Sequence, residues 1–541
     1  MRLGSRVLER VLDLDPPVTR DLVVRRDLPV PMPDGVELLA DLWEPRSGGA
    51  SWPVALMRSA YGRRGLVGAA GVRPLAERGY RVLIQSVRGT HGSGGVFDPA
   101  RQERADGLAT LDWLVGQPWC GDSVVLVGAS YLGYAHWAVA DQLPIQVKAL
   151  IPQVTESALT LEFLRRDGLT LETPFVWGVT NAGPQPRGVL GGLLRIRRTS
   201  RALRTLPLGD ADLAATGHHI GYAQDVLLHP ADAPRWAGVD HRHRVGRVKV
   251  PVSSVAGWYD IFLPGRLRDF RILQEAGVPA RLTVGPWVHQ ALTGVPFREA
   301  VEFGLPYARG ARPAPRAPVR LYVTGEERWR DFDTWPPAGY PPRRLHLHQG
   351  AALSADMPAE SAPDRYRYDP NDPTPAVGGI RAAGGGPVDN TGLEARRDVL
   401  TYTTPVLDRD VEVIGEVGAE IWFRSSLPYA DVFVRLCDVD PRGRSVNVCD
   451  GLVGLSGADE LACAAVRLWP TAHRFRRGHR VRVQVSSGAF PRYARNPGTG
   501  EPHATATRLL PADQTVHHDP EHPSAILLPV RRDPPCQGGS S

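Results

Sequence analysis

The sequence predicts an α/β domain with a mostly parallel sheet, interrupted by a helical insertion and followed by an antiparallel β domain. Between residues 20 and 150, short apolar runs alternate with helical patterns, which is typical of a parallel sheet covered on both faces. From 155 to 245 the pattern is helical and rich in arginine, and after 315 short alternating stretches are separated by turn residues. A chain of 541 residues exceeds one compact core, so several domains are expected.

The elements of the α/β part can be placed in order along the chain. The apolar runs WPVALMRS, YRVLIQSV and SVVLVG indicate buried strands, while VRPLAERG and RADGLATLDWLVGQ have helical spacing. In the insertion, LTLEFLRRDG and GGLLRIRRTSRALRTL are helical, and afterwards VKVPVSSVAGWYD and PARLTVGPWVHQ restore the strand pattern. We therefore expect the first part of the α/β core at 1–154, an inserted helical cap at 155–247, and the second part of the core at 248–315.

The last part of the chain has the pattern of an all-β domain. RRLHLHQG, VEVIGEVGAEIWFRSS, ADVFVRLCDVD and RVRVQVSSG alternate as strands do and are separated by glycine, proline and aspartate. They predict a C-terminal antiparallel sandwich or jelly roll at 316–535, with a Gly/Pro-rich loop at 374–387 and a tail at 536–541.

Charge and hydropathy limit the partners of this protein. The formal net charge is +6 and the pI is near 9.2, but the cations are nearly all arginine, with lysine only at Lys148 and Lys249, and they are scattered among acids. This distribution argues against a nucleic-acid partner. Residues 1–20 lack the apolar core of a signal peptide, and the sequence has no apolar run of membrane-spanning length. We expect a cytoplasmic protein without a membrane partner.

Cysteine and histidine usage predicts neither a disulfide framework nor a metal site. The five cysteines are sparse and have no CxxC spacing, which suits a reducing compartment; they are Cys120, Cys437, Cys449, Cys463 and Cys536. The histidine clusters GHHI, HRHR, HLH and VHHDP are interpreted as surface loops. No metal and no organic cofactor is expected, since RGTHGSGG lacks the frame of a phosphate-binding loop.

Ser130 is a candidate nucleophile because of the element in which it stands. The strand SVVLV runs into Gly128, Ala129 and Ser130, and YLGYAHWAVA follows with a helical pattern. A strand that turns sharply into a helix at a serine, with small residues around it, is the nucleophile elbow of α/β-hydrolases. The common elbow is G-x-S-x-G, whereas here the second glycine, Gly133, comes one residue later. The motif by itself leaves a structural serine as an equal alternative.

Two further candidates lie downstream in the chain order that α/β-hydrolases use. The strand VPVSSVAG runs into WYDIF, which places Asp260 just past a strand end, and the strand ARLTVGPW runs into His289. α/β-Hydrolases use a serine, an acid and a histidine in this chain order. Each of the three residues follows a strand here, and the site of an open parallel sheet lies at the carboxyl ends of its strands. Taken singly, Asp260 is a turn residue and His289 a structural histidine.

The segments GASYLGYAHW, GWYDIF and GPWVHQ resemble the three triad segments of the cocaine esterase and X-Pro dipeptidyl-peptidase superfamily, whose elbow has the G-x-S-Y-x-G form. The resemblance extends to MPDGVELLADLWEP, QSVRGTHGSGG and QPWCGDSVVLVG in the first part of the chain. Three C-terminal segments resemble the jelly roll of that superfamily and imply a domain of the galactose-binding-like kind: RWRDFDTWPP, DVFVRLCDVDPRGRSVNVCDG and LWPTAHRFRRGHRVRVQVSSGAFPRYARNP. The resemblance thus covers most of the chain and is weakest in the cap.

The resemblance implies a role for each candidate residue. Ser130 becomes the nucleophile, His289 the general base and acid, and Asp260 the carboxylate that orients the histidine. The oxyanion hole consists of the backbone N–H of Tyr131 and the hydroxyl of Tyr61, which follows the strand VALMRS. From the residues alone, Tyr61 is a packed aromatic side chain at the edge of the domain.

One loop departs from the superfamily pattern. The loop after RVLIQ usually begins Asp-x-Arg-Gly, but here it begins Ser86-Val87-Arg88-Gly89. We therefore expect the ion pair that supports this loop to be missing or replaced.

Substrate preference depends on the residues that follow Asp260. The related α-amino acid ester hydrolases place acids two and three residues after the aspartate, where this chain has Phe262 and Leu263. An aromatic residue there favours an apolar acyl group, so Phe262 and Trp258 are the candidate substrate-binding residues. The predicted activity is a carboxylic ester hydrolase that cleaves esters, or amides, with an apolar acyl part.

Two alternatives stay open. Cap carboxylates such as Glu156, Glu162 or Asp167 would supply an amine site, and the protein would then be an X-Pro dipeptidyl-peptidase or an α-amino acid ester hydrolase. In the second alternative the jelly roll binds carbohydrate or a partner and the α/β part is an inactive scaffold. The partner expected otherwise is a small-molecule ester or amide. A homodimer is compatible with the resemblance, and the sequence does not decide it.

Overall fold

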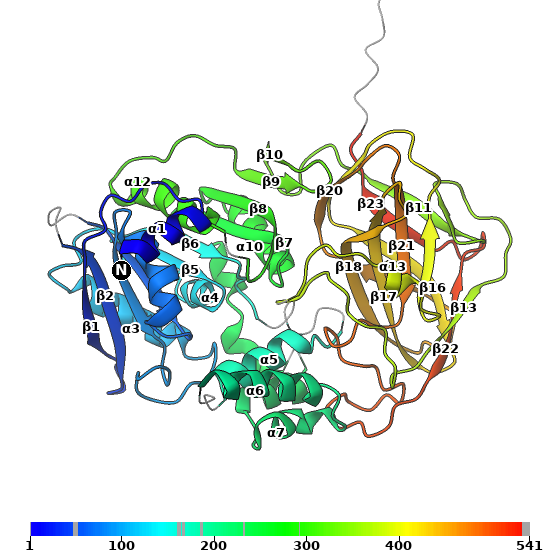
Figure 1. Cartoon of the computed structure of the whole chain (residues 1–541), viewed down its shortest axis with the longest axis horizontal. Helices are drawn as coiled ribbons and strands as arrows, with labels where there is room; N and C mark the ends of the chain where they lie inside the picture. The colour runs from blue at the N-terminus through cyan, green and yellow to red at the C-terminus, as the bar shows by residue number, and fades with distance from the viewer. Residues whose placement is uncertain are drawn as a thin grey trace, which may run out of the picture.

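The structure is a computed structural model that describes residues 2–46, 52–159, 164, 168–183, 188–230, 233–291, 293–382 and 384–532. Figure 1 shows an α/β half and a β half side by side, with helices α5, α6 and α7 below the junction between them. The prediction of an α/β hydrolase domain followed by a largely antiparallel β domain is confirmed. Among the described residues, no helix is both long and apolar enough to span a bilayer.

The α/β half contains one sheet of ten strands. Its strands, in spatial order, are β1 (Leu22–Pro31), β2 (Glu37–Pro45), β4 (Arg81–Ser86), β3 (Val54–Ser59), β5 (Val124–Ala129), β6 (Val147–Gln153), β7 (Val252–Tyr259), β8 (Ala280–Val288), β9 (Val319–Val323) and β10 (Arg328–Phe332). The strands from β4 to β9 are parallel, and the pairs at both edges are antiparallel. The central strands read as continuous apolar runs because helices cover both faces.

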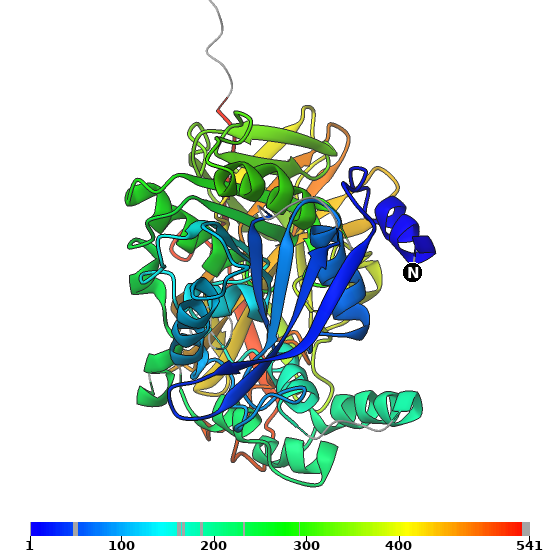
Figure 2. The ribbon, with the colours of Figure 1, turned by 90° about the vertical axis from the view of Figure 1, so that its left-hand side faces the viewer.

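The helices of this half are α1 (Arg2–Val11), α2 (Arg73–Ala76), α3 (Glu103–Val115), α4 (Tyr131–Trp137), α10 (Leu263–Glu275), α11 (Val295–Glu299) and α12 (Leu305–Ala308), with π-helical turns at Val67–Val72 and Ala300–Gly304. Figure 2 shows this half from the side of β1 and β2, with the cap helices below it. Two apolar clusters hold the helices against the sheet, and Leu126 of β5 belongs to one while Val125 belongs to the other. Side chains along a strand alternate between the faces, so neighbouring residues reach different layers.

The first sheet continues past residue 315, where the sequence analysis placed the start of the jelly roll. Strand β9 pairs in parallel with β8, and β10 pairs with β9. The short alternating pattern of VRLYV, with every second residue buried, resembles the strands that follow it. Periodicity alone therefore could not show to which sheet this strand belongs.

The second half is built almost entirely from antiparallel strands. Its large sheet contains β13 (Asp364–Tyr368), β22 (Ala512–His517), β16 (Gly418–Ser425), β23 (Ala525–Pro529), β11 (Pro342–His348), β12 (Ala352–Ser354), β14 (Leu400–Thr403), β21 (Arg480–Ser486), β17 (Tyr429–Val439) and β18 (Ser445–Ser456), with β19 (Ala462–Arg467) on β16. A separate pair contains β15 (Val411–Gly415) and β20 (Thr471–Phe475), and helix α13 spans Thr391–Glu394. Of these pairs only β12 with β14 is parallel.

The segment between β6 and β7 is helical, as predicted for the cap. It contains α5 (Glu172–Asn181), α6 (Gly188–Ala202), α7 (Ala211–Thr216), α8 (Gly221–Leu228) and α9 (Arg242–Val245), with 3₁₀ turns at Leu208–Asp210 and Pro234–Val239. The predicted helix over LTLEFLRRDG lies mostly outside the described residues.

The cap is bonded to the β half although it is inserted in the α/β half. The backbone N–H groups of Leu171 and Gly209 donate to the carbonyls of Arg492 and Ala504, at 2.8 Å each. Phe175 and Leu203 of the cap also share one apolar cluster with side chains from residues 490–504. The cap and the β half are therefore packed together, although the cap is inserted in the α/β half.

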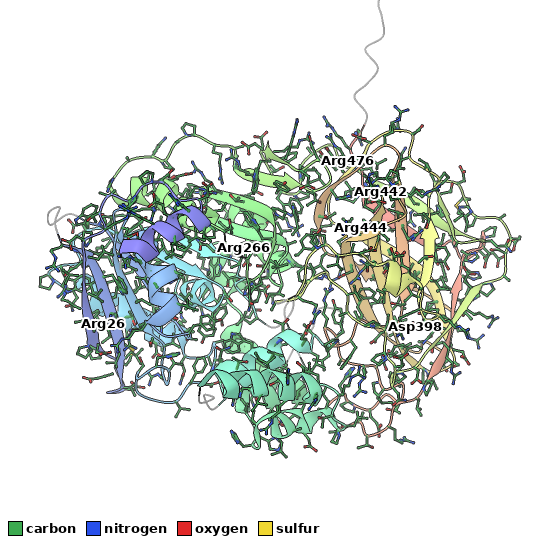
Figure 3. The ribbon with its side chains drawn as sticks, viewed as in Figure 1. Arg26, Arg266, Asp398, Arg442, Arg444 and Arg476 are labelled. Atoms are coloured by element: carbon green, nitrogen blue, oxygen red, sulfur yellow. The ribbon has the colours of Figure 1, made fainter. Side chains whose placement is uncertain are left out.

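The arginines are spread over both halves. Figure 3 labels Arg26 on the outer edge of the first sheet, Arg266 inside the α/β half, and Arg442, Arg444 and Arg476 on the β half. Arg266 is fully buried and donates to the carbonyl of Thr155.

Candidate active site

Ser130 stands in a strained turn between β5 and α4. Its φ is +56° and its ψ is −126°, a conformation that residues with a side chain rarely adopt. The Ser130 N–H donates to the carbonyl of Gln153 at 2.8 Å, and its own carbonyl accepts from Gly133 and Tyr134, at 3.0 Å each. These bonds on both sides hold the turn, as in a nucleophile elbow.

Close backbone approach explains the two glycines of the elbow. A Cβ on Gly128 would lie 2.5 Å from the backbone carbon of Leu132, and a Cβ on Gly133 would lie 2.5 Å from Cγ2 of Thr155. Helix α4 thus packs against the end of β5 and against the loop after β6 at positions where no side chain fits. The second glycine is needed at 133 because that residue faces Thr155.

Asp260, His289 and Ser130 form a hydrogen-bonded chain. Asp260 follows β7 and His289 follows β8, so three strands of one sheet deliver the three side chains to one edge. His289 Nδ1 lies 3.1 Å from Asp260 Oδ2, and His289 Nε2 lies 3.0 Å from Ser130 Oγ. The Asp260 side chain is fully buried, whereas that of His289 is 12% exposed.

The carboxylate sets the direction of this chain. A carboxylate accepts hydrogen bonds, so the Nδ1–H of His289 donates to Asp260 and leaves Nε2 to accept the Ser130 hydroxyl. Asp260 Oδ1 also accepts from the backbone N–H of Phe262 at 2.7 Å, which fixes the carboxylate. The arrangement can remove a proton from the serine hydroxyl.

The Tyr61 hydroxyl lies beside Ser130 and the backbone N–H of Tyr131. It accepts a hydrogen bond from Nε1 of Trp177 at 3.0 Å, and it is within hydrogen-bond contact of the Ser130 side chain and the Tyr131 backbone. Burial raises the pKa of Tyr61 above its ordinary value, so the phenol keeps its proton at neutral pH and can donate it to an anion. Sequence reasoning missed Trp177, whose place in a helical pattern is typical of a core residue.

A buried ion pair lies beneath the elbow. The Tyr131 hydroxyl donates to Glu103 Oε1 at 2.7 Å, and Glu103 Oε2 pairs with Arg58 Nη1 at 2.7 Å. The ring of Trp177 stacks on that of Tyr131, with centroids 5.6 Å apart. The residue that begins α4 is therefore held from both sides.

The ion pair of the 86–89 loop, expected to be missing or replaced, is replaced by acids elsewhere in the chain. Arg88 pairs with Asp106 and with Asp34, each at 2.7 Å. The Ser86 hydroxyl accepts from Arg63 at 2.7 Å, and Arg63 pairs with the buried Asp41. The loop thus keeps an anchored arginine without an acid at position 86.

Ser130 and His289 line a cavity of about 640 Å³. Its wall includes apolar side chains of both the core and the cap, among them Val176, Trp177, Ile261 and Phe262. The ring of Phe262 meets that of His289 edge to face, with centroids 5.3 Å apart.

Trp258, the other expected substrate-binding residue, is not among the described residues that line the cavity. Its side chain is buried, its indole N–H donates to the carbonyl of Tyr322 at 2.7 Å, and its ring packs on Trp335. The structure therefore brings Phe262, but not Trp258, to the cavity.

Of the cap carboxylates considered from the sequence, Glu156 is fully buried against Gly265 and is not among the residues lining the cavity. Glu162 and Asp167 lie outside the described residues. Glu172, at the start of α5, does line the cavity, together with Arg381 from the 374–387 loop of the β half. Both were missed, since neither stands in a motif.

The histidine cluster VHHDP, expected to be a surface loop, lies in a group of possible metal ligands. His517 at the end of β22, and Asp519 and His522 in the loop that follows it, bring one donor atom each within 4.8 Å of one another. None of the three lines the cavity.

Two family models match the chain. X-Pro dipeptidyl-peptidase (S15 family) matches residues 34–291, and the X-Pro dipeptidyl-peptidase C-terminal non-catalytic domain matches residues 314–527. Cocaine esterase of Rhodococcus sp. (strain MB1 Bresler) is 33% identical over 570 residues, which cover 94% of this chain and 98% of that protein.

Two solved structures share the fold over nearly their full length. An aminopeptidase from a marine sediment Thaumarchaeota archaeon has a TM-score of 0.81 and 23% identity, covering 95% of this chain and 97% of its own. An α-amino acid ester hydrolase has a TM-score of 0.82 and 23% identity, covering 96% and 98% respectively. At this identity the two likenesses bear on the fold alone.

Proposed function

Because this chain belongs to the CocE/NonD family of serine hydrolases, with an S15 catalytic domain and an X-Pro dipeptidyl-peptidase C-terminal domain, we propose that it hydrolyses uncharged carboxylic esters with an apolar acyl group. One observation carries the proposal. The hydrogen-bonded chain from Asp260 through His289 to Ser130 opens into a cavity with a largely apolar wall.

The geometry suits acyl transfer in two steps. Ser130 Oγ attacks the ester carbonyl while His289 Nε2 takes its proton, and the Tyr131 N–H and the Tyr61 hydroxyl donate to the oxyanion that forms. The tetrahedral intermediate collapses, the histidinium gives its proton to the leaving alkoxide, and the acyl group stays on Ser130. Water, deprotonated by His289, then releases the carboxylic acid and restores the serine.

The surroundings of the reacting groups support an apolar acyl group. Phe262 stands directly against His289, and Ile261, Val176 and Trp177 extend the apolar surface. Burial of an aromatic or branched acyl chain against such side chains contributes about 25 cal/mol for each Å² removed from water.

The first experiment compares a panel of substrates on the wild type and on Ser130→Ala. The panel contains p-nitrophenyl acetate, butyrate and benzoate, an α-amino acid p-nitroanilide and an X-Pro p-nitroanilide. We expect turnover of the neutral esters, with benzoate or butyrate best in kcat/KM, and its loss in Ser130→Ala.

The matched control is Ser200→Ala, because Ser200 also lines the cavity and donates to a carbonyl of its own helix, that of Ile196. This variant is expected to keep ester turnover. Hydrolysis of only the amine-bearing substrates would contradict the ester proposal and favour the peptidase. An absence of turnover, with no labelling of Ser130 by a fluorophosphonate, would favour a binding scaffold.

A further inference from the structure

In the part of the chain that the structure describes, the cavity wall is mostly apolar and carries one pair of opposite charges. Among the described residues that line it, Glu172 is the one carboxylate and Arg381 the one guanidinium. They are bound to each other in a two-pronged contact, with Arg381 Nε 2.8 Å from Glu172 Oε2 and Nη2 2.6 Å from Oε1. Each of these two charges is thus paired with an opposite charge inside the cavity.

The pair is partly shielded from water. The Glu172 side chain is 21% exposed and that of Arg381 is 22% exposed. The hydrogen bonds to Glu172 raise the pKa of Arg381 above its ordinary value. A charge so placed interacts with a substrate group more strongly than a charge on the open surface does.

Glu172 is held in place by its backbone as well as by the pairing of its side chain with Arg381. Glu172 is the first residue of α5, and its N–H donates to the carbonyl of Pro491 in the β half at 3.1 Å. The neighbouring Leu171 is bonded in the same way to Arg492.

The loop that carries Arg381 is also anchored. Gly379 and Gly386 exchange two backbone hydrogen bonds of 2.8 Å, which close the base of the loop tip. The buried Arg435 donates to the carbonyl of Val377 at 2.8 Å, and the Asn447 side chain accepts from the Val388 N–H at 2.9 Å. Hydrogen bonds therefore hold the backbone near both charged residues, so the two side chains are in place to pair without a movement of either segment.

We propose that Glu172 and Arg381 are specificity-determining residues, whose mutual neutralisation makes the cavity select uncharged substrates over those with an ammonium or a carboxylate group. The inference rests on the proposed function and deepens it. A substrate ammonium group would have to compete with Arg381 for Glu172, and a substrate carboxylate would have to compete with Glu172 for Arg381. Selectivity here comes from charges already satisfied rather than from the absence of charge.

The test uses the full-length protein and three p-nitrophenyl esters of similar size: a neutral acyl ester, an α-amino acyl ester and a dicarboxylic acid monoester. The variants are Arg381→Gln, Glu172→Gln and the double variant. In the wild type we expect kcat/KM to be highest for the neutral ester.

Each single variant is expected to change the ranking in its own direction. Arg381→Gln leaves the Glu172 carboxylate without its counter-charge, so the ratio of kcat/KM for the amino ester to that for the neutral ester should rise by about tenfold or more. Glu172→Gln should raise the ratio for the acidic ester by a similar factor. The double variant should return to the ranking of the wild type, because both charges of the pair are then removed together.

Arg344→Gln is the matched control. Arg344 forms a two-pronged pair with Glu420 on the β half, and neither residue lines the cavity. It should leave all ratios unchanged. Added salt should reduce the altered ratios of the single variants and not those of the wild type.

The outcomes separate the two proposals. If the wild type hydrolyses none of the three esters, the proposed function has failed. If it hydrolyses them and both single variants change all three rates by one common factor, the pair is structural and the specificity proposal is overturned. Each single variant decides by itself, so one variant that does not fold leaves the other as a complete test.

Discussion

The two sides of the cavity are built in different ways. On the α/β side, Ser130, Asp260 and His289 each follow a strand of one continuous sheet. On the other side, Glu172 and Arg381 are 209 residues apart and belong to a cap helix and to a loop of the β half. Ser130, Asp260 and His289 depend on one sheet, whereas the opposite wall depends on contacts between separate parts of the chain. Chemistry and selectivity should therefore respond to different substitutions.

The largest effect is expected on the α/β side, from Asp260→Asn. The asparagine amide would donate a hydrogen bond where the carboxylate accepts one. His289 would then accept it at Nδ1 and carry its proton on Nε2, so Nε2 could no longer accept the proton of Ser130. We expect kcat for the neutral ester to fall about ten-thousandfold, with the ranking of substrates retained in the residual activity. Pre-steady-state kinetics would show slow acylation of Ser130. A change in ranking with little loss of kcat would contradict the separation of the two sides.

The next largest effect is expected on the stability of the β half, from Arg435→Met. Arg435 is buried, lies 3.0 Å from Asp450 and donates to Val377 and Asn390. Its removal leaves buried acceptors unpaired and should lower the free energy of unfolding by about 3–5 kcal/mol. Urea unfolding followed by circular dichroism measures this change. Labelling of Ser130 by a fluorophosphonate should persist at low temperature, because the sheet that carries the serine is intact.

The control for this variant is Arg344→Met, which breaks a more exposed pair with Glu420. Its cost should stay below about 1 kcal/mol. Equal costs for the two variants would show that the buried network contributes no more than a surface pair.

Tyr61→Phe should lower kcat by about a hundred- to a thousandfold with little change in KM, because the hydroxyl donates to charge that develops only during the reaction. Trp177→Phe removes the indole N–H that contacts the same hydroxyl and should cost less. Steady-state kinetics on the neutral ester distinguishes the two roles. A raised KM with unchanged kcat would make Tyr61 a packing residue.

The smallest effect on catalysis is expected from Asp431→Asn, in the β half. Burial raises the pKa of Asp431 to about 7, and its carboxyl accepts from the Asn496 amide at 2.8 Å. In the folded protein Asp431 keeps its proton between about pH 4 and pH 7, while the unfolded chain has lost it, so stability falls as pH rises through this window. A rise of the pKa from 3.8 to about 7 corresponds to a loss of about 4 kcal/mol, fully present above pH 7.

Asp431→Asn should remove this pH dependence and be more stable than the wild type near pH 8. Thermal melts at several pH values provide the measurement. Ester kinetics at one pH should not change, since Asp431 is not among the residues that line the cavity. If the melting temperatures of both proteins changed with pH in the same way, this would contradict the raised pKa of Asp431.

The sequence predicted the α/β side of the site well because its signals are local. Each of Ser130, Asp260 and His289 directly follows an apolar run that can be read as a buried strand, and the two elbow glycines mark close packing within a few residues. The structure brings these three side chains into hydrogen-bond distance. Their catalytic roles stay predictions until the variants are measured.

The opposite wall could not be predicted because its contacts are non-local. Nothing near Glu172 in the sequence indicates Arg381, and nothing near Arg88 indicates that Asp34 takes the place of a neighbouring acid. Trp258 shows a second limit. It lies two residues before Asp260, but it still belongs to β7, and its ring packs in the core beside Trp335.

The bonding of the cap to the β half has a consequence for synthesis on the ribosome. The strands that carry Ser130, Asp260 and His289 emerge before the segment around Phe490 and Ala504, on which the cap packs. The apolar side chains of Leu171, Phe175 and Leu203 therefore lack the cover that this segment supplies until most of the polypeptide has been translated, and we expect a chaperone to bind them on the nascent chain. The strands that carry Ser130, Asp260 and His289 are synthesised first, and the segment that completes the opposite wall of the cavity is synthesised last.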